Sequence, residues 1–186
     1  GGAAYARFIT RGAFHTLIDL TPHELTRIML AGACVPMPER FTAGRHLPRV
    51  VLPGALNFIG LGERRLVPPA YLERQHYEHS GYFTHVKLTQ DEMARVATQL
   101  IADLNAASGP RHLIVPMGGF SHQDRPGGAI EDPNLRMVLL EHARGGLAPD
   151  VGLTVVDAHI SEPPVTAAIA DALHSFSPAT KDVTHV

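Results

Sequence analysis

The fold is decided by Leu113-Ile114-Val115-Pro116-Met117-Gly118-Gly119-Phe120-Ser121-His122-Gln123-Asp124-Arg125-Pro126-Gly127-Gly128, followed shortly by Asp132-Pro133. The apolar start predicts a buried strand, the glycine-rich polar stretch predicts a loop, and Asp-Pro is typical of a helix start. Proteins of the α/β class use this order to present backbone N–H groups and polar side chains to a ligand at the carboxyl end of a strand. A long connecting loop that is polar because it is exposed is the structural alternative.

Strands and helices alternate along the rest of the chain. Apolar runs predict strands at 16–20, 49–52, 112–115 and 153–156, with a further short strand at 76–79. Helices are predicted over 3–11, 22–31, 90–107, 133–145 and 163–173, two of them behind capping boxes that start at Thr21 and Thr89. Such an alternation indicates a mainly parallel sheet covered on both faces. We therefore predict one three-layer α/β/α Rossmann-like domain over 1–176, with a flexible tail at 177–186.

Composition narrows the class of protein. The 186 residues are 45% hydrophobic and 18% charged, with a formal net charge of −2. Because Lys and Arg form no basic stripe, nucleic-acid binding is not predicted. The single cysteine, Cys34, excludes an internal disulfide framework and a cysteine zinc cluster and fits a reducing compartment, so we expect a cytoplasmic protein. Apolar runs fall short of the roughly 20 residues that cross a bilayer, and no membrane partner is expected.

The start of the chain is unusual. It reads Gly1-Gly2-Ala3, without an initiator methionine, and enters a predicted helix at once. We expect a piece of a longer protein whose N-terminal domain is missing here. An apolar face that such a domain covered tends to find another partner. We therefore expect a homodimer, most simply one with two-fold symmetry.

Polar residues gather directly after four of the predicted strands. Each has a structural explanation on its own, such as capping a helix or holding a turn. Because the carboxyl ends of parallel strands share one edge of a sheet, together they predict a ligand site at that edge. Glycines there permit close backbone approach and anion-binding turns. We assign binding of a small anionic ligand to Asp19, Thr21, Gly54, Asn57, Gly118, Gly119, Ser121, Gly127 and Gly128.

Acid–base chemistry at this edge is assigned to Asp157, His159 and Asp124. A histidine with an unperturbed pKa near ~6.5 can transfer protons when a carboxylate orients it. A loop histidine that is solvated, or that bonds a backbone carbonyl, is the structural alternative. A divalent metal held by these three residues and His122 is chemically feasible. Because 12 histidines make chance clusters common, no metal ligand is assigned.

Three familiar motifs are missing from the sequence. Gly119-Phe120-Ser121-His122-Gln123 lacks the second glycine of a nucleophile elbow, so a serine hydrolase is not favoured. Neither the P-loop pattern nor the dinucleotide pattern Gly-x-Gly-x-x-Gly occurs. Nucleotide binding therefore does not follow from a standard glycine motif.

Four motifs in order nevertheless carry a family resemblance that spans nearly the full length. They are Asp19-Leu20-Thr21 with Glu24-Leu25, Pro53-Gly54-Ala55-Leu56, Ser121-x-x-Asp124-x-Pro126-Gly127-Gly128 with Asp132-Pro133, and Asp157-Ala158-His159-Ile160. In these motifs the chain resembles the second α/β domain of the tobamovirus-resistance ATP-binding protein family, the Tm-one-like proteins. The resemblance implies a Rossmann-like fold, association with ATP and a paired N-terminal domain. Gly1-Gly2 would then be the remnant of a glycine-rich turn at the join.

This chain departs from the family pattern at three positions. Asn57 stands where the family has Asp, Gly60 where it has Asn, and Gly118 where it has Arg. Losing a carboxylate and a guanidinium from one site changes its charge and its affinity for anions.

These observations lead to two functional readings. In the first, the chain is the C-terminal domain of a two-domain, ATP-binding enzyme that acts on a small anionic metabolite at the strand ends, with a divalent metal allowed. In the second, it is a non-catalytic ligand- or protein-binding regulatory module. The plant members of the family, which act by binding a viral replication protein, make the second reading a direct rival.

Overall fold

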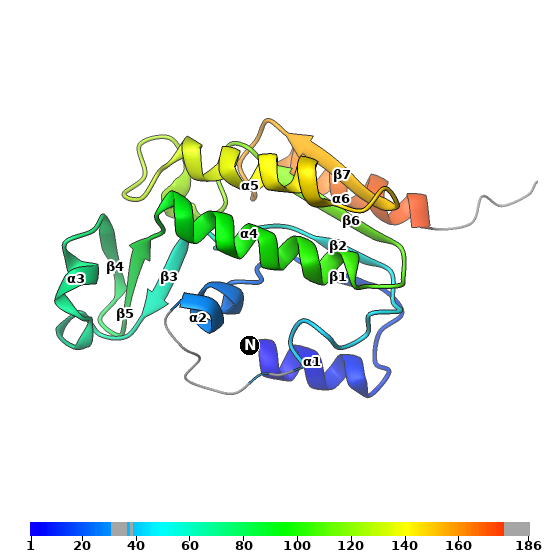
Figure 1. Ribbon diagram of the computed structural model, residues 1–186, viewed down its shortest axis with the longest axis horizontal. Helices are drawn as coiled ribbons and strands as arrows, with labels where there is room; N and C mark the ends of the chain where they lie inside the picture. The colour runs from blue at the N-terminus through cyan, green and yellow to red at the C-terminus, as the bar shows by residue number, and fades with distance from the viewer. Residues whose placement is uncertain (31–36, 38, 177–186) are drawn as a thin grey trace, which may run out of the picture.

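The computed structural model describes residues 1–30, 37 and 39–176 (Figure 1). In chain order the elements are α1 (Gly2–Thr10), β1 (Leu17–Asp19), α2 (Glu24–Leu30), β2 (Arg49–Val51), β3 (Phe58–Leu61), the 3-10 helix η1 (Arg64–Leu66), α3 (Pro69–Leu72), β4 (His76–Ser80), β5 (Phe83–Lys87), α4 (Gln90–Asn105), β6 (Arg111–Pro116), the 3-10 helix η2 (His122–Asp124), α5 (Pro133–Gly146), β7 (Val151–Val156) and α6 (Pro163–Phe176). The tail predicted at 177–186 lies outside the described residues. Within the described part of the chain, no helix has both the length and the apolar character to span a bilayer.

Four parallel strands form the main sheet in the order β1-β2-β6-β7. Ile18 is the register partner of Val50, Val50 of His112, and His112 of Gly152. The predicted mainly parallel sheet is therefore confirmed. Because all four strands run the same way, their carboxyl ends lie at one edge of the sheet.

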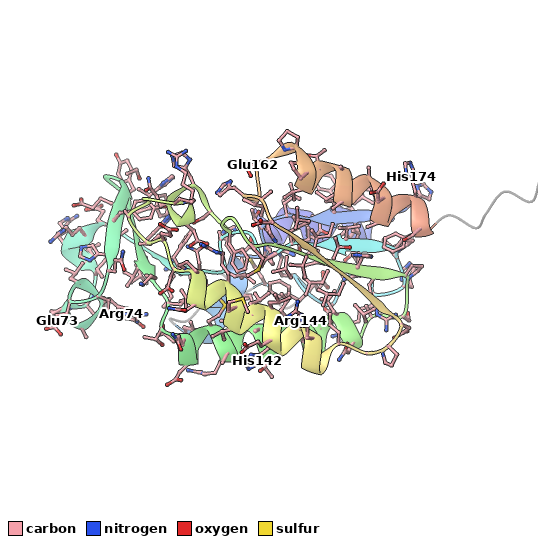
Figure 2. The ribbon with its side chains drawn as sticks, turned by 90° about the horizontal axis from the view of Figure 1, so that it is seen from above. Glu73, Arg74, His142, Arg144, Glu162 and His174 are labelled. Carbon is pink, nitrogen blue, oxygen red and sulfur yellow. The ribbon has the colours of Figure 1, made fainter. Side chains whose placement is uncertain are left out.

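Helices cover both faces of this sheet, which confirms the predicted three-layer α/β/α arrangement. The larger core lies between the sheet and the face formed by α2, α4 and α5, and a smaller core lies under α6. Figure 2 shows the separation of the layers, with Glu162 and His174 on the α6 side and His142 and Arg144 on the α5 side. α1 shares the face of α4, since Ile9 and Leu104 line one cavity over β1 and β2.

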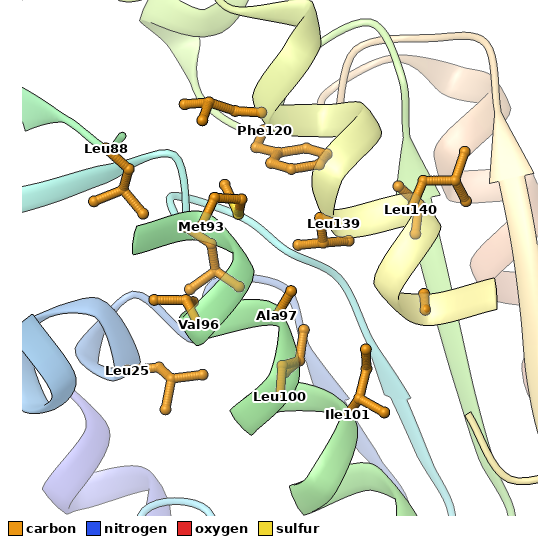
Figure 3. Packing of buried hydrophobic residues seen from close by; sticks show 14 of the residues in the cluster. Leu25, Leu88, Met93, Val96, Ala97, Leu100, Ile101, Phe120, Leu139 and Leu140 are labelled. Atoms are coloured by element: carbon orange, nitrogen blue, oxygen red, sulfur yellow. The ribbon is translucent and has the colours of Figure 1, made fainter. Parts of the chain in front are cut away.

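Helix α4 forms where the sequence predicts it. The Thr89 hydroxyl accepts a hydrogen bond from the Glu92 amide at 3.2 Å, and the Glu92 carboxylate accepts one from the Thr89 amide at 2.9 Å. This capping box satisfies two of the free N–H groups at the helix start. The apolar face of α4 then packs against α5, and Figure 3 shows the contact. The buried residues on this face of α4 are Met93, Val96, Ala97, Leu100, Ile101 and Leu104.

A second sheet, antiparallel and in the order β3-β5-β4, was predicted only in its strand β4. It follows directly after β2, so it lies beyond the carboxyl end of the main sheet (Figure 1). Its strands are short, and their polar residues hide the pattern: Thr84 is fully buried in β5, and Gly60 interrupts β3. Pairing with neighbouring strands, rather than local pattern, makes these segments strands.

Candidate functional site

The four strand ends of the main sheet are tied to one another by backbone hydrogen bonds. The Gly54 amide donates to Leu20 O at 3.0 Å, joining the ends of β1 and β2. The Ala55 amide donates to Phe120 O at 2.9 Å, joining the end of β2 to the loop after β6. The Gly118 amide donates to Ala158 O at 2.9 Å, joining that loop to the turn after β7. The predicted site segments therefore lie side by side at one edge.

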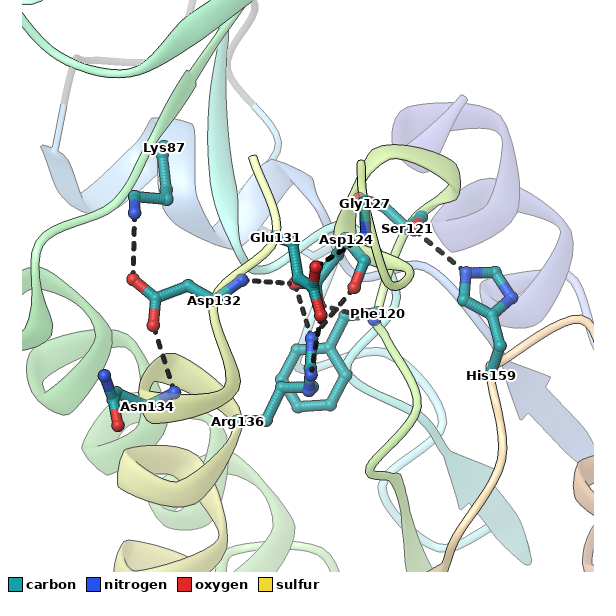
Figure 4. A network of polar contacts seen from close by, with 10 residues as sticks. All are labelled: Lys87, Phe120, Ser121, Asp124, Gly127, Glu131, Asp132, Asn134, Arg136 and His159. Carbon is teal, nitrogen blue, oxygen red and sulfur yellow. Dashed lines mark hydrogen bonds and ion pairs between the residues drawn. The ribbon is translucent and has the colours of Figure 1, made fainter. Parts of the chain in front are cut away.

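Asp124 anchors the loop between β6 and α5 from inside the protein (Figure 4). Its side chain is fully buried and accepts hydrogen bonds from the Phe120 amide at 2.8 Å, the Asp132 amide at 3.1 Å and Nη1 of Arg136 at 2.7 Å. Burial raises the pKa of the Asp124 carboxyl, and these donors oppose the rise. Both carboxylate oxygens are occupied within the chain. The geometry therefore favours a positioning role for Asp124 over the proton transfer predicted from the sequence.

Several loop amides that were predicted to bind an anion donate hydrogen bonds within the protein. The amides of Gly118, Gly127 and Gly128 donate to Ala158 O, the Glu131 carboxylate and Arg125 O. At the start of α5, Asp132 accepts from the Asn134 amide at 3.0 Å and pairs with Nζ of Lys87 at 2.9 Å. These three amides and the start of α5 are thereby satisfied within the protein, which leaves fewer backbone donors for an anion.

The glycines of this edge are explained by close backbone packing. A Cβ on Gly118 would lie 2.5 Å from the backbone of Ala158 and His159, and one on Gly54 would overlap Leu20 O. Gly119 and Gly127 adopt positive φ angles of 139° and 77°. The arginine expected at position 118 has no room for its side chain here, which accounts for the glycine.

His159 latches the turn after β7 onto the loop after β6. Its Nε2 lies 2.9 Å from Ser121 O and its Nδ1 lies 2.7 Å from the Ser161 hydroxyl. Because a carbonyl oxygen only accepts, the proton sits on Nε2, and Nδ1 accepts from Ser161. Both ring nitrogens are engaged, so His159 holds the two segments together in this structure.

A cleft of about 380 Å³ opens beside this latch. The loop after β6 contributes Gly118, His122 and Arg125 to its lining, and the turn after β7 contributes Asp157, His159 and Glu162. Asp157 and Arg125 are exposed, so the walls carry accessible groups of both charge signs. A volume of this size lies in the range of small-molecule sites, roughly 300–1,000 Å³.

Unpartnered polar groups and a strained residue occur together near the end of β2. Asn57 is fully buried, and among the described residues neither polar atom of its side chain has a hydrogen-bond partner. Ala55 adopts a φ of 58°, which an L-residue rarely does. The Ser121 hydroxyl likewise lacks a partner in the described part of the chain. Strain and unpaired polar groups of this kind cluster at functional sites.

Asp19 is held in an ion-pair cluster that the sequence analysis did not predict. Arg40 lies 2.7 Å from Oδ2 of Asp19 and 3.1 Å from Oε2 of Glu24, and its side chain is 4% exposed. The Glu24 carboxylate pairs with Arg40. Helix α2 begins at Glu24 and not at Pro22, where the sequence predicts its start. Burial, followed by the charge of Asp19, raises the pKa of the neighbouring Tyr5 to about 12. This cluster fixes the end of β1 and leaves Asp19 partnered without a ligand.

The described residues contain no group of three or more His, Cys, Asp or Glu side chains that could hold a metal ion. The metal alternative of His122, Asp124, Asp157 and His159 therefore does not assemble. Asp124 points into the Arg136 contact, and His159 is used as the latch.

Residues 1–177 match the family described as "Uncharacterised protein family (UPF0261) C-terminal domain". A UPF0261 protein of Brucella melitensis is 27% identical over 165 residues, covering 88% of this chain and 40% of the relative. A UPF0261 protein of Rhizobium meliloti is 31% identical over 143 residues, covering 76% and 36%. The ToMV resistance protein Tm-1 of Solanum lycopersicum is 25% identical over 193 residues, covering 98% and 25%.

The chain thus spans less than half the length of each of these relatives. The tomato match confirms the resemblance to the Tm-one-like proteins drawn from the four motifs. Because residues 1–177 match the family model, the chain belongs to the UPF0261 family and is similar to its C-terminal domain.

Proposed function

We propose that this chain is the substrate-binding domain of a two-domain, ATP-associated enzyme, and that a small anionic metabolite binds in the cleft between the loop after β6 and the turn after β7. The observation that carries the proposal is the cleft of about 380 Å³ at the carboxyl edge of the sheet. The Asp124–Arg136 contact and the His159 latch hold its two walls in place. Fixed walls favour binding because little ordering is left to occur when a ligand arrives.

The side chains of the cleft define the chemistry of the ligand. Arg125 and His122 supply donors, and a guanidinium is suited to a carboxylate or phosphate. Asp157 and Glu162 supply carboxylates, which accept hydrogen bonds from hydroxyl or amino groups. The ligand that fits is a small metabolite with one anionic group and one or more hydroxyl or amino groups. In the enzyme reading, the exposed Asp157 accepts a proton from a hydroxyl or amino group of the bound metabolite.

ATP is part of the proposal because of the resemblance to the Tm-one-like proteins, and a divalent metal is part of it because carboxylates line the cleft. Mg²⁺ binds through one or two carboxylates together with phosphate oxygens. Asp157 and Glu162 are the two carboxylates of the cleft that would hold such an ion when a phosphate is present.

A non-catalytic ligand-binding module is the second candidate, and two observations favour it. The carboxylate of Asp124 and both ring nitrogens of His159 are occupied by contacts within the chain. A general acid or base needs a free position toward its substrate. In this reading, the same cleft binds its ligand without turnover.

Calorimetry tests the proposal. The chain is titrated with ATP, with and without Mg²⁺, and with small carboxylated and phosphorylated metabolites. Arg125→Ala should weaken binding of the anionic ligand by about tenfold or more, since a charge-assisted hydrogen bond contributes about 1.5–3 kcal/mol. Arg95→Ala, an exposed arginine on α4, is the matched control and should bind as the unmodified chain does. Equal affinity in both variants would contradict the proposed cleft. Turnover assays on the same variants separate the enzyme from the module.

A further inference from the structure

Four exposed apolar side chains occur in the stretch that runs from α1 to the residue after β1. Phe8, Phe14, Ile18 and Leu20 are 53%, 40%, 44% and 45% exposed. The rings of Phe8 and Phe14 contact each other edge to face, with centroids 6.4 Å apart. We call these four residues the β1 strip. Exposed apolar side chains at the margin of a sheet mark an interaction surface more often than singly scattered ones do.

β1 is also an edge strand. Its inner side bonds to the β2 segment, since the Leu17 amide donates to Pro48 O at 2.9 Å and Asp19 O accepts from the Leu52 amide at 2.9 Å. Because backbone groups alternate in direction along a strand, the N–H and C=O of Ile18 point away from β2. The described residues place no strand on that side of β1. On the opposite face of the sheet, α6 packs on β2, β6 and β7, and the side chains of Ile18 and Leu20 remain exposed.

The order of the crossovers indicates what fits this edge. On the α4 face, each connecting helix leads to the next strand in the same direction across the sheet. α2 leads from β1 to β2, α4 leads to β6, and α5 leads to β7. α1 lies on this same face and ends just before β1, at the outer margin of the row (Figure 1). Its start lies near the carboxyl end of β1, where Gly2 packs against Arg40 and Glu24.

A helix in that place has the geometry of one more crossover. Parallel crossovers are right-handed in almost all proteins, so a strand that leads into α1 would lie on the free side of β1. It would run parallel to β1, face the N–H and C=O of Ile18, and cover the apolar side chains beside them.

We propose that the free edge of β1 and the β1 strip dock an extended strand that lies parallel to β1. In the longer UPF0261 proteins, the polypeptide on the N-terminal side of this domain supplies that strand. The matched family is described as a C-terminal domain, and only 40% of the Brucella melitensis relative is covered, so the relatives contain further chain that can supply this strand. A second copy of this chain is the competing occupant.

Amide hydrogen exchange of Ile18, followed by NMR, tests the proposal. The 186-residue chain is compared with the same chain extended by the segment that precedes the matched region in the Brucella melitensis relative. The Ile18 amide should exchange rapidly in the unextended chain and about tenfold or more slowly in the extended one. Ile18→Pro removes that N–H and should abolish the rise in melting temperature that the extension produces. An extension of scrambled sequence serves as the control, and it keeps the comparison valid if Ile18→Pro does not fold.

Each other outcome overturns the proposal. Unchanged Ile18 exchange in the extended chain, or equal slowing by the scrambled segment, would mean that no specific strand docks there. Slow exchange in the unextended chain that depends on protein concentration would assign the edge to a second copy instead.

Discussion

Nη1 of Arg136 lies 2.7 Å from Oδ1 of Asp124 and 2.8 Å from its backbone oxygen, with both side chains buried (Figure 4). Arg136 belongs to α5 and Asp124 to the loop that precedes it. This contact therefore fixes the loop on the helix that follows it, and one wall of the cleft depends on it.

Removing the arginine should destabilise the fold strongly. Arg136→Met leaves the Asp124 carboxylate buried without its counter-charge, which costs about 3–5 kcal/mol in comparable buried pairs. Urea unfolding monitored by circular dichroism measures the change. Arg144→Met, at an exposed position on the same helix, should cost less than about 1 kcal/mol. A cost for Arg136→Met no greater than that of the control would mean that the contact does not stabilise the loop.

Adding a methyl group at Gly118 should also destabilise the protein. The new Cβ would lie 2.5 Å from backbone atoms of Ala158 and His159, so the loop and the turn must separate. Overpacking of this kind costs about 1–3 kcal/mol. Gly145→Ala is the opposite case, because it lies in α5 with open space around its Cβ and should stabilise by roughly 0.5–1 kcal/mol. Thermal unfolding that shows the same sign for both substitutions would contradict the packing argument.

His85 should make the fold sensitive to acid. Burial, and then the nearby His79 and His23, lower the pKa of His85 from 6.5 to about 4. Between these two values the unfolded chain holds a proton that the folded chain does not, so stability is fully present above pH 6.5 and falls as the pH drops toward 4. His85→Gln should therefore lose less melting temperature between pH 7.5 and 4.5 than the unmodified chain loses. His15→Gln, at an exposed position, should keep the full loss. Equal losses in all three proteins would exclude His85 as the cause.

His159 should control the local stability of the loop more than global stability. His159→Phe keeps a ring but removes the donor to Ser121 O at 2.9 Å. One hydrogen bond contributes about 0.5–1.5 kcal/mol net, so amide exchange across 119–124 should quicken by up to roughly tenfold. Exchange in β6, which precedes the loop, should remain slow in the same experiment. If the loop amides keep their exchange rates, His159 is not the latch, and a free catalytic role becomes the better reading.

Local pattern predicted most of the elements, although α2 begins at Glu24 and not directly after the capping box predicted at Thr21. The capping box of Thr89 and Glu92 and the apolar stripe behind it predicted α4, which runs from Gln90 to Asn105. Strand–helix alternation predicted the parallel sheet and the shared edge. The antiparallel sheet was largely missed because β3 and β5 owe their pairing to each other and to burial of residues such as Thr84.

The shared edge of the candidate segments could be predicted from the sequence, whereas the contacts of their side chains could not. Asp124 was assigned to acid–base work because its partner Arg136, 12 positions further on, cannot be recognised from spacing alone. Arg40 was missed for the same reason, since its contact with Asp19 spans 21 positions. Contacts that depend on tertiary structure decide which polar side chains are occupied and which remain free for a ligand.

A crystal structure of the chain soaked with ATP, Mg²⁺ and the metabolite that calorimetry identifies tests the central claim most directly. We expect ligand density in the cleft, with an anionic group within hydrogen-bond distance of Arg125 and a hydroxyl or amino group at Asp157 or Glu162. Ligand density elsewhere on the molecule, with the cleft lined by Arg125 and Asp157 holding only water, would contradict it.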